Sequence, residues 1–209
     1  YQQTILAPAF TALLFFFVIS IAIGSRVNYE FNYINFLAPG LIVMTMMQNA
    51  FANTSSSILG SKMQGNIVDL LMPPLSPNEI IFSYVLAAII RSILVGFITW
   101  LFIYPFSELY LFSLSTLFIY TILGSILLAL FGLIAGIWSE KFDNMSGITN
   151  FIIIPLTFLS GTFYNIESLP EPFFTISLFN PFYYIIDGFR SAFQSNINQD
   201  LVYGITYIS

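Results

Sequence analysis

The sequence predicts an all-α integral membrane protein, and three observations lead to this fold class. Hydrophobic residues make up 57% of the chain and charged residues only 7%, whereas soluble domains average about 25% charged residues. The mean hydropathy is +0.87. The chain contains several apolar runs of about 20 residues. As helices with a rise of about 1.5 Å per residue, these runs are long enough to cross a hydrocarbon core of about 30 Å. We therefore expect residues 1–209 to form one transmembrane domain.

Five membrane spans are expected, at residues 4–24, 36–58, 80–104, 111–138 and 148–163. Pro155 lies inside the fifth span, where it predicts a kink or local unwinding. The sequence opens without a methionine, and a new apolar run starts near Ile205. We therefore expect both ends to be cut from a longer protein, with a truncated sixth span.

The composition excludes several kinds of function. The chain has no Cys and no His, so it lacks thiol chemistry, imidazole bases and the usual zinc ligands. Its net charge of −5, with only five Lys and Arg, argues against nucleic-acid binding, which needs clustered positive charge. An intramembrane enzyme is disfavoured, because the spans hold no paired carboxylates and no serine–base constellation. We expect no catalytic residue, no metal site and no directly bound cofactor.

A polar insert at residues 60–79 separates the second and third spans, and the rest of the chain is organised around it. Prolines break the helix there, because each removes a backbone donor and restricts the residue before it. These are Pro73, Pro74 and Pro77. Before them, Ile67, Leu70 and Leu71 recur at i, i+3 and i+4, the spacing of a short amphipathic helix along the membrane surface. The other faces carry Gln64, Asn66 and Asp69. An ordinary loop with one surface turn is the alternative.

Polar groups occur deep inside two of the spans. Asn49, Asn53 and Ser56 recur at i, i+4 and i+7 in the second span and share one face. That face must contact protein or water, because an amide facing lipid would lack a partner. In the third span Arg91 lies eleven residues from the predicted start, where a charge normally faces the bundle interior and is paired. Its partner is not evident, and snorkelling toward the interface is an equal alternative.

The fourth span carries a face of small residues that permits close approach of another helix. The face consists of Ser125, Ala129, Gly132 and Gly136. Packing within the chain is the preferred interpretation, and dimerisation is the alternative.

Two apolar pieces follow the fifth span, at residues 167–179 and 181–190. Pieces of about 10 to 14 residues are more often interfacial or re-entrant than spanning. We expect a helical hairpin that dips into the outer leaflet, with Asn180-Pro181 between its arms. Asp187 and Arg190 lie three residues apart on one helix face, which suits an ion pair. Lys and Arg are shared equally between the two sides, so charge does not set the orientation.

Four segments in this order resemble the type-2 permeases of ATP-binding-cassette (ABC) transporters. They are residues 36–53, 62–81, 151–170 and 180–190. The most specific feature is Phe-Leu-Ser-Gly ending at Gly161, followed by Leu-Pro at Pro170 and then by Asn180-Pro181. The branch that the chain resembles holds bacterial permeases of the multidrug-exporter type.

The resemblance implies a fold, an orientation and a partner. It implies the ABC type-2 exporter fold with six spans in the bacterial inner membrane. It places the insert in the cytoplasm against a separate ABC ATPase, and residues 167–190 on the outer side. The outer hairpin is marked by Gly161, Pro170, Asn180, Pro181, Asp187 and Arg190. The residues expected to couple to the ATPase are Lys62, Gln64, Ile67, Asp69, Leu70, Leu71, Pro73 and Pro74.

ATP must bind to another subunit, because the chain has no G-x-x-x-x-G-K-[ST] phosphate-binding motif. We expect ATP and Mg on the partner ATPase, and a homodimer or a pair with a homologous permease in the lipid bilayer. Closure of the ATPase would move the helix of the insert and rock the second and third spans. The side chains expected to line the pathway or the subunit interface are Gln48, Asn49, Asn53 and Ser56.

The functional prediction is therefore a permease subunit of an ATP-driven exporter. Its apolar spans, rich in Met and Phe, slightly favour an amphiphilic, lipid-like or drug-like substrate over a bulky glycan. The alternative is a passive channel or membrane scaffold without an ATPase partner. The amphipathic, proline-ended insert distinguishes the two, since only the exporter needs a docking element.

Overall fold

The computed structural model describes residues 2–24, 33–107 and 109–193, which are almost entirely helical. The long helices are α1 (Gln2–Gly24), α2 (Tyr33–Met63), α4 (Pro77–Ile103) and α5 (Leu114–Trp138). The shorter helices are α3 (Ile67–Leu71), α6 (Phe142–Ile148), α7 (Ile154–Phe158), α8 (Phe173–Leu178) and α9 (Pro181–Ser191). Single turns are formed by η1 (Tyr104–Phe106), η2 (Thr149–Ile153) and η3 (Ile166–Ser168).

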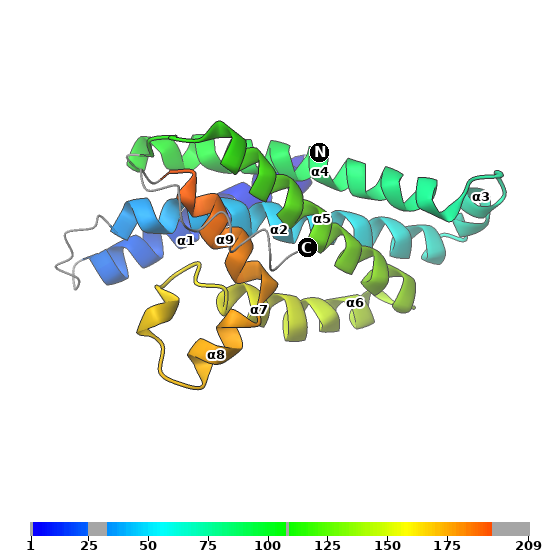
Figure 1. Ribbon diagram of the computed structural model, residues 1–209. Coiled ribbons are helices and arrows are strands. Elements are labelled where there is room, and N and C mark those ends of the chain that lie inside the picture. Colours follow the sequence, from blue (N-terminus) through cyan, green and yellow to red (C-terminus); the bar gives the residue numbers. More distant parts are fainter. Residues whose placement is uncertain (1, 25–32, 108, 194–209) are drawn as a thin grey trace.

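Helix α2 forms the centre of the bundle (Figure 1) and packs against α1, α4, α5 and α9. Within the described residues, α1, α2, α4 and α5 are the helices long and apolar enough to cross a membrane. They coincide with the first four predicted spans. The expected sixth span lies outside the described residues.

Helix α2 extends beyond both predicted ends of the second span. It runs from Tyr33 to Met63, so that Lys62, assigned to the insert, lies in its last turn. Its 31 residues correspond to about 46 Å at about 1.5 Å per residue, which exceeds a hydrocarbon core of about 30 Å. The end that carries α3 projects from the bundle (Figure 1).

Helix α4 begins at Pro77 rather than at residue 80. Ser76 caps it, because the Ser76 hydroxyl accepts from the Glu79 N–H (3.4 Å) and the Glu79 carboxylate accepts from the Ser76 N–H (2.7 Å). Proline suits the first helical position, where its missing N–H would have no partner in the helix. The predicted break in the helix is present between α3 and α4, and Pro77 in addition starts α4.

The small residues of α5 pack against α2 within the chain, as preferred from the sequence. A Cβ on Gly132 would lie 2.5 Å from the Phe51 carbonyl oxygen, and one on Gly136 would lie 2.9 Å from the Ser55 carbonyl oxygen. Only glycine permits this approach. Thr54 Oγ1 also donates to the Ala129 carbonyl (3.0 Å), which joins the two helices across the seam.

The region of the fifth predicted span is a distorted helical run over residues 142–158. The helix begins at Phe142, before the predicted start at residue 148, and ends at Phe158, before the predicted end at residue 163, so both bounds differ from the predicted ones. Its middle, η2, is a π-helical turn. Pro155 lies two residues after the end of this turn and accounts for it, because proline lacks an N–H and crowds the preceding turn. The local distortion expected at Pro155 is therefore present.

The predicted outer hairpin is helical only in parts. The turn η3 and helix α8 take the place of a continuous first arm at residues 167–179, whereas α9 matches the second arm. Asn180 caps α9, since its Oδ1 accepts from the Phe182 N–H (3.1 Å), and Pro181 follows at the first helical position. Helix α9 packs mainly on α5 and α2 rather than on α8. Its buried face includes Phe182, Ile185, Ile186 and Phe189.

Candidate functional site

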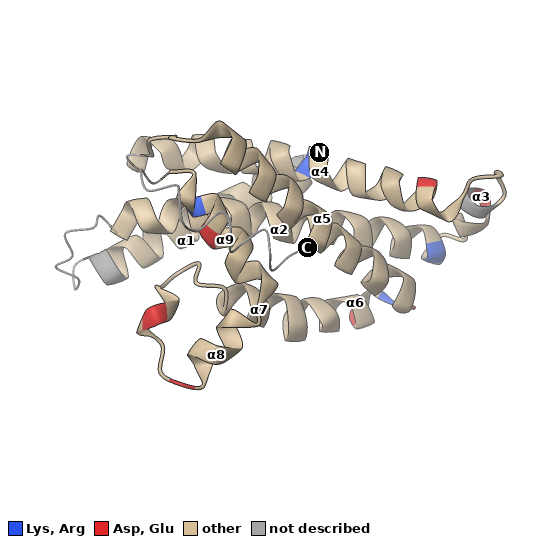
Figure 2. Cartoon of the chain, viewed as in Figure 1, with Lys and Arg blue, Asp and Glu red and all other residues tan. Residues whose placement is uncertain are grey.

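Charged residues lie mostly toward the ends of the bundle, and few lie between them (Figure 2). Lys62 lies at the end of α2, next to the end of α5. Arg190 lies near the start of α2, where it contacts Phe36. Because α2 separates these two residues along most of its length, the chain presents two polar regions, one on each side of the apolar helices.

The insert exposes apolar side chains at its end of the bundle. Gly65, with φ of +76°, reverses the chain before α3, a conformation that favours glycine. Four apolar side chains are then exposed, and we call them the insert cluster: Met63 (54%), Val68 (57%), Met72 (76%) and Leu75 (49%). Exposed apolar patches of this kind mark surfaces that meet a partner or a membrane.

The predicted coupling residues all belong to this end of the bundle, but they differ in exposure. Those that are exposed are Gln64, Asp69, Pro73 and Pro74. Ile67 is half-buried. The side chains of Leu70 and Leu71 are not among those that the structure describes. The accessible apolar contacts of α3 and its exit are instead Val68 and Met72, which the helical spacing of Ile67 with Leu71 did not indicate.

The side chain of Lys62 forms hydrogen bonds with another helix of the same chain. Its Nζ donates to the carbonyl oxygens of Ile137 (2.7 Å), Ser139 (2.6 Å) and Gly136 (3.4 Å). These carbonyls lie at the C-terminal end of α5, where helix carbonyls lack intrahelical partners and a cation is favoured. Lys62 therefore joins the end of α2 to the end of α5.

The polar face of α2 contacts two different helices. Gln48 Nε2 donates to Thr157 Oγ1 (3.3 Å) on α7, whereas Asn53 Oδ1 accepts from Arg91 Nη1 (2.6 Å) on α4. Asn49 is buried, and its Nδ2 lies 3.5 Å from the Thr45 carbonyl oxygen. Ser56 bonds to the backbone of its own helix. Gln48 and Asn53 thus contact other helices and Asn49 is buried, whereas Asn53 and Ser56 stay partly exposed.

Arg91 therefore has a partner that the sequence did not identify. Besides Asn53, its Nη2 lies 3.5 Å from the Thr4 carbonyl oxygen on α1. Both polar groups stand out in the sequence as isolated polar residues within apolar spans. Polar groups inside apolar spans are usually paired, but the sequence does not say which helices are neighbours, so Asn53 could not be singled out.

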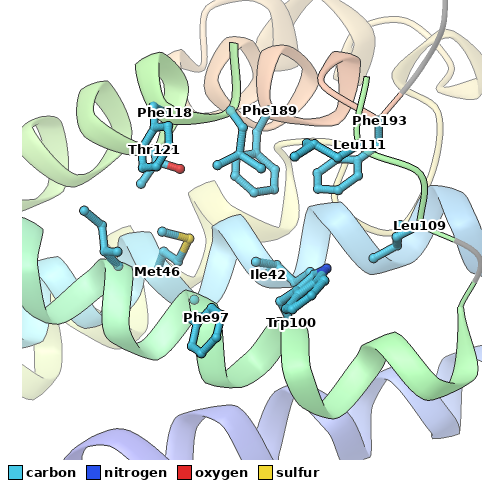
Figure 3. Close-up of a pocket in the computed structure, with 13 residues that line it drawn as sticks. Ile42, Met46, Phe97, Trp100, Leu109, Leu111, Phe118, Thr121, Phe189 and Phe193 are labelled. Carbon is cyan, nitrogen blue, oxygen red and sulfur yellow. The ribbon is translucent and has the colours of Figure 1, made fainter. Parts of the chain in front are cut away.

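An apolar cavity of about 220 Å³ lies between α2, α4, α5 and α9 (Figure 3). Its lining includes the aromatic side chains of Phe97, Trp100, Phe118, Phe189 and Phe193. No residue in the lining is charged. No pattern in the sequence indicates this cavity, because it forms between helices that are distant in the chain.

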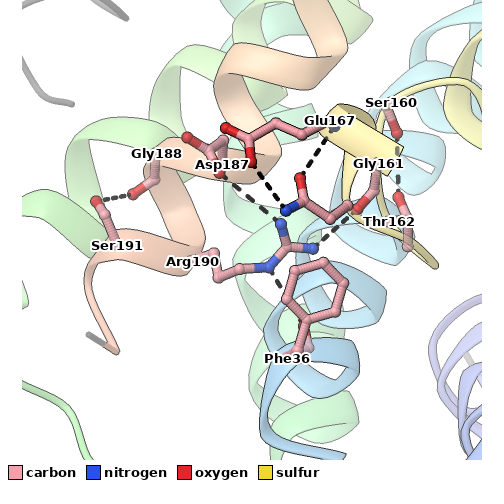
Figure 4. A network of polar contacts seen from close by, with 10 residues as sticks. Phe36, Ser160, Gly161, Thr162, Glu167, Asp187, Gly188, Arg190 and Ser191 are labelled. Carbon is pink, nitrogen blue, oxygen red and sulfur yellow. Dashed lines mark hydrogen bonds and ion pairs between the residues drawn. The ribbon is translucent and has the colours of Figure 1, made fainter. Parts of the chain in front are cut away.

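At the opposite end of α2 from the insert, Arg190 holds several segments together (Figure 4). Its Nη2 donates to the Gly161 carbonyl (3.0 Å), its Nε donates to the Phe36 carbonyl (3.3 Å), and its Cζ lies 3.7 Å from the centre of the Phe36 ring. The expected ion pair with Asp187 is present, with 3.8 Å between Nη1 and Oδ1. Arg190 lies outside the four apolar spans; burial lowers its pKa to about 10, although Asp187 acts in the opposite direction, and it stays protonated at neutral pH.

The outer residues predicted from the sequence divide into two groups. Gly161, Asn180, Asp187 and Arg190 take part in the contacts around α9. Gly161 has a φ of +73°, and Asn180 Nδ2 donates to the Leu156 carbonyl (2.7 Å). Pro170 is exposed and lies outside these contacts. A polar cavity of about 270 Å³ borders Arg190, Asp187 and Glu167.

Comparison with known proteins places the chain in a family. A family model described as ABC-2 type transporter matches residues 1–193. The chain is 38% identical over 197 residues to the inner membrane transport permease YadH of Escherichia coli (strain K12), and the match covers 91% of this chain and 75% of that protein. The permeases of the same name in Escherichia coli O157:H7 and Shigella flexneri match equally well. No solved structure matches.

Membership of this family implies an ABC ATPase partner in general terms. The family model and the relatives also agree with the several apolar helices of the bundle. The chain belongs to the ABC-2 type transporter family and is a multi-pass inner-membrane transport permease rather than an enzyme.

Proposed function

We propose that this permease is the membrane subunit of an ATP-driven exporter and that the insert at residues 60–79 docks on its ABC ATPase. The insert cluster carries the proposal. It exposes apolar side chains on a segment that also holds the exposed Asp69 and Glu79, a mixture that suits a groove on a water-soluble subunit better than the bilayer interior.

The connections of the insert suit it to transmit movement. Lys62 joins the end of α2 to the end of α5, and the capping box of Ser76 and Glu79 starts α4. A displacement of α3 would therefore reach three of the apolar helices through short, hydrogen-bonded connections. Pro73 and Pro74 restrict the backbone between α3 and α4, which limits how much of that displacement the loop absorbs.

In this mechanism, ATP and Mg bind to the ATPase, and its closure rocks α2 and α4 between two packed arrangements. Two copies of the permease, or this chain and a homologue, would enclose the pathway. The half-buried Ser56 would face that pathway or the subunit interface, whereas Asn49 is buried within the chain and Gln48 and Asn53 contact α7 and α4. The direction is export, and the substrate is an amphiphilic, lipid-like or drug-like molecule.

Co-purification tests the docking role. The permease would be co-expressed with each ABC ATPase of its source genome and purified through a tag on the permease in mild detergent. We expect the ATPase to be recovered with the wild type and lost with Val68→Asp/Met72→Asp, which places two charges in the insert cluster.

Phe179→Asp is the matched control, because Phe179 is equally apolar and 73% exposed but lies between α8 and α9. Its ATPase recovery should equal that of the wild type. A wild-type permease that emerges without an ATPase under several gentle conditions would contradict the exporter mechanism and favour a passive channel or scaffold.

A further inference from the structure

We propose that the ABC ATPase meets the insert through a positively charged surface, on which lysine or arginine side chains pair with Asp69 and Glu79. The inference rests on the docking role proposed above and names the chemistry of the partner at that site. It can fail while the docking role stands, because the apolar contacts of the insert cluster would also hold a neutral surface.

Both carboxylates of the insert are open to a partner. Asp69 and Glu79 are exposed, and exposed carboxylates are ionised at neutral pH. Glu79 accepts from the Ser76 N–H (2.7 Å) and from the Ser76 hydroxyl (2.9 Å), and both bonds use Oε2. Its Oε1 therefore remains available to a group on another protein.

The lysine of the insert does not neutralise these acids. Lys62 is the only basic residue between positions 60 and 79. Its Nζ donates to the carbonyl oxygens of Ile137 (2.7 Å) and Ser139 (2.6 Å). Although Lys62, Asp69 and Glu79 are all described, no ion pair joins the lysine to either acid. The insert therefore offers two carboxylates to a partner, and its one ammonium group is held against the end of α5.

The loop that follows α5 adds to this imbalance. Its first residue, Ser139, is joined to the insert through Lys62. Glu140 and Asp143 come next and are exposed, together with Lys141. Acidic side chains therefore outnumber exposed basic ones at this end of the bundle.

Such a surface suits a protein better than the membrane surface. In the proposed orientation the insert lies beside the cytoplasmic leaflet, whose anionic lipids attract lysine and arginine and repel acids. The exposed Val68 (57%) and Met72 (76%) are therefore better covered by a protein than by headgroups. Asp69 follows Val68 on α3, so the charge and the apolar contact enter the same part of the partner. That part must be basic, because like charges across an interface weaken binding.

The salt dependence of binding tests the inference. The permease would be held on a biosensor in phosphatidylcholine nanodiscs, which carry no net charge, and binding of the ATPase that co-purifies with it would be measured. We expect the wild-type affinity to fall about tenfold between about 0.1 M and about 0.5 M salt, since salt screens exposed charge pairs. Asp69→Asn/Glu79→Gln should bind about tenfold more weakly at low salt and respond less to added salt.

The substitutions are chosen to leave the fold in place. Asparagine matches aspartate in shape, and glutamine can replace glutamate in a capping box, so the Ser76 N–H keeps its acceptor. Glu167→Gln/Glu171→Gln is the matched control. It makes the same change of charge at two exposed residues, which lie in or just after η3 and away from the insert. Its affinity for the ATPase should equal that of the wild type.

A reversal of charge gives the sign of the partner surface. Asp69→Lys should bind more weakly than Asp69→Asn, because it places like charges together. Tighter binding of Asp69→Lys than of the wild type would overturn the inference by indicating an acidic partner. Equal, salt-independent affinities of the wild type and Asp69→Asn/Glu79→Gln would also overturn it, while the docking role would still be judged by Val68→Asp/Met72→Asp. A wild type that binds no ATPase at low salt would overturn both.

Discussion

The ammonium group of Lys62, in the last turn of α2, donates a hydrogen bond to the carbonyl oxygen of Ile137 at the end of α5 (2.7 Å). The same group reaches the Ser139 carbonyl at 2.6 Å. A residue expected from the sequence to face an ATPase therefore caps a neighbouring helix. Its contribution to coupling would be mechanical, because it fixes the distance between the two helix ends that border the insert.

Lys62→Met should destabilise the permease by about 1–2 kcal/mol, the range expected for charge-assisted hydrogen bonds and a cation at a helix C-terminus. The midpoint of detergent-induced unfolding in micelles would measure this loss. Lys141→Met is the control, because Lys141 is an exposed lysine close to the same end of α5. Equal midpoints for the two variants would show that Lys62 has no capping role.

Arg91 and Asn53 should be energetically coupled. Arg91→Met and Asn53→Ala each remove one partner of the 2.6 Å hydrogen bond between α4 and α2. Hydrogen bonds between membrane helices average about 0.6 kcal/mol and reach about 1.7 kcal/mol. We expect a coupling energy near 1 kcal/mol from a double-mutant cycle on the free energy of unfolding. Strictly additive single and double variants would mean that the bond contributes nothing to stability.

The hydrogen bonds and ring contact of Arg190 should contribute far more to stability than its ion pair with Asp187. Arg190→Met removes hydrogen bonds to two backbone carbonyls and the contact with the Phe36 ring, which we expect to cost about 3 kcal/mol. Asp187→Asn should cost less than about 1 kcal/mol, because the pair is long at 3.8 Å and the Asp187 side chain is 39% exposed. Unfolding midpoints of the two variants measure the difference. A larger loss for Asp187→Asn would reverse this ranking.

Adding a side chain at Gly132, where α5 packs against α2, should lower the free energy of unfolding. A Cβ there would lie 2.5 Å from a backbone oxygen, so Gly132→Ala should cost about 1–3 kcal/mol through overpacking. Gly147 in α6 has nothing within 4 Å of the corresponding position. Gly147→Ala should therefore be neutral or stabilising by up to about 1 kcal/mol. If the two substitutions had equal effects on unfolding, close packing at the seam would be refuted.

The sequence predicted the helices best where composition alone determines them. Four apolar runs, one of them interrupted by Arg91, correspond to four long helices, because bilayer thickness imposes a length that can be counted. The small-residue face on α5 and the ion pair of Asp187 with Arg190 were also predictable, since both follow from spacing on a single helix.

Features that depend on contacts between helices were not predictable. The partner of Arg91 and the capping role of Lys62 each require knowing which helices are neighbours. The start of α4 was missed because it depends on the residue that precedes the proline. Pro77 looked like a terminator because proline breaks helix interiors, yet a capping serine before it makes it a first residue.

The most direct test of the docking role is cross-linking from the insert cluster to the ATPase. The described sequence contains no cysteine, so Met72→Cys, at a position that is 76% exposed, gives a defined attachment point. With a short cysteine-to-amine reagent on the assembled transporter, we expect a covalent product containing one permease and one ATPase. Phe179→Cys, at the other end of the bundle, should give none. A Met72→Cys permease that stays uncross-linked in a complex shown to contain the ATPase would contradict docking through the insert.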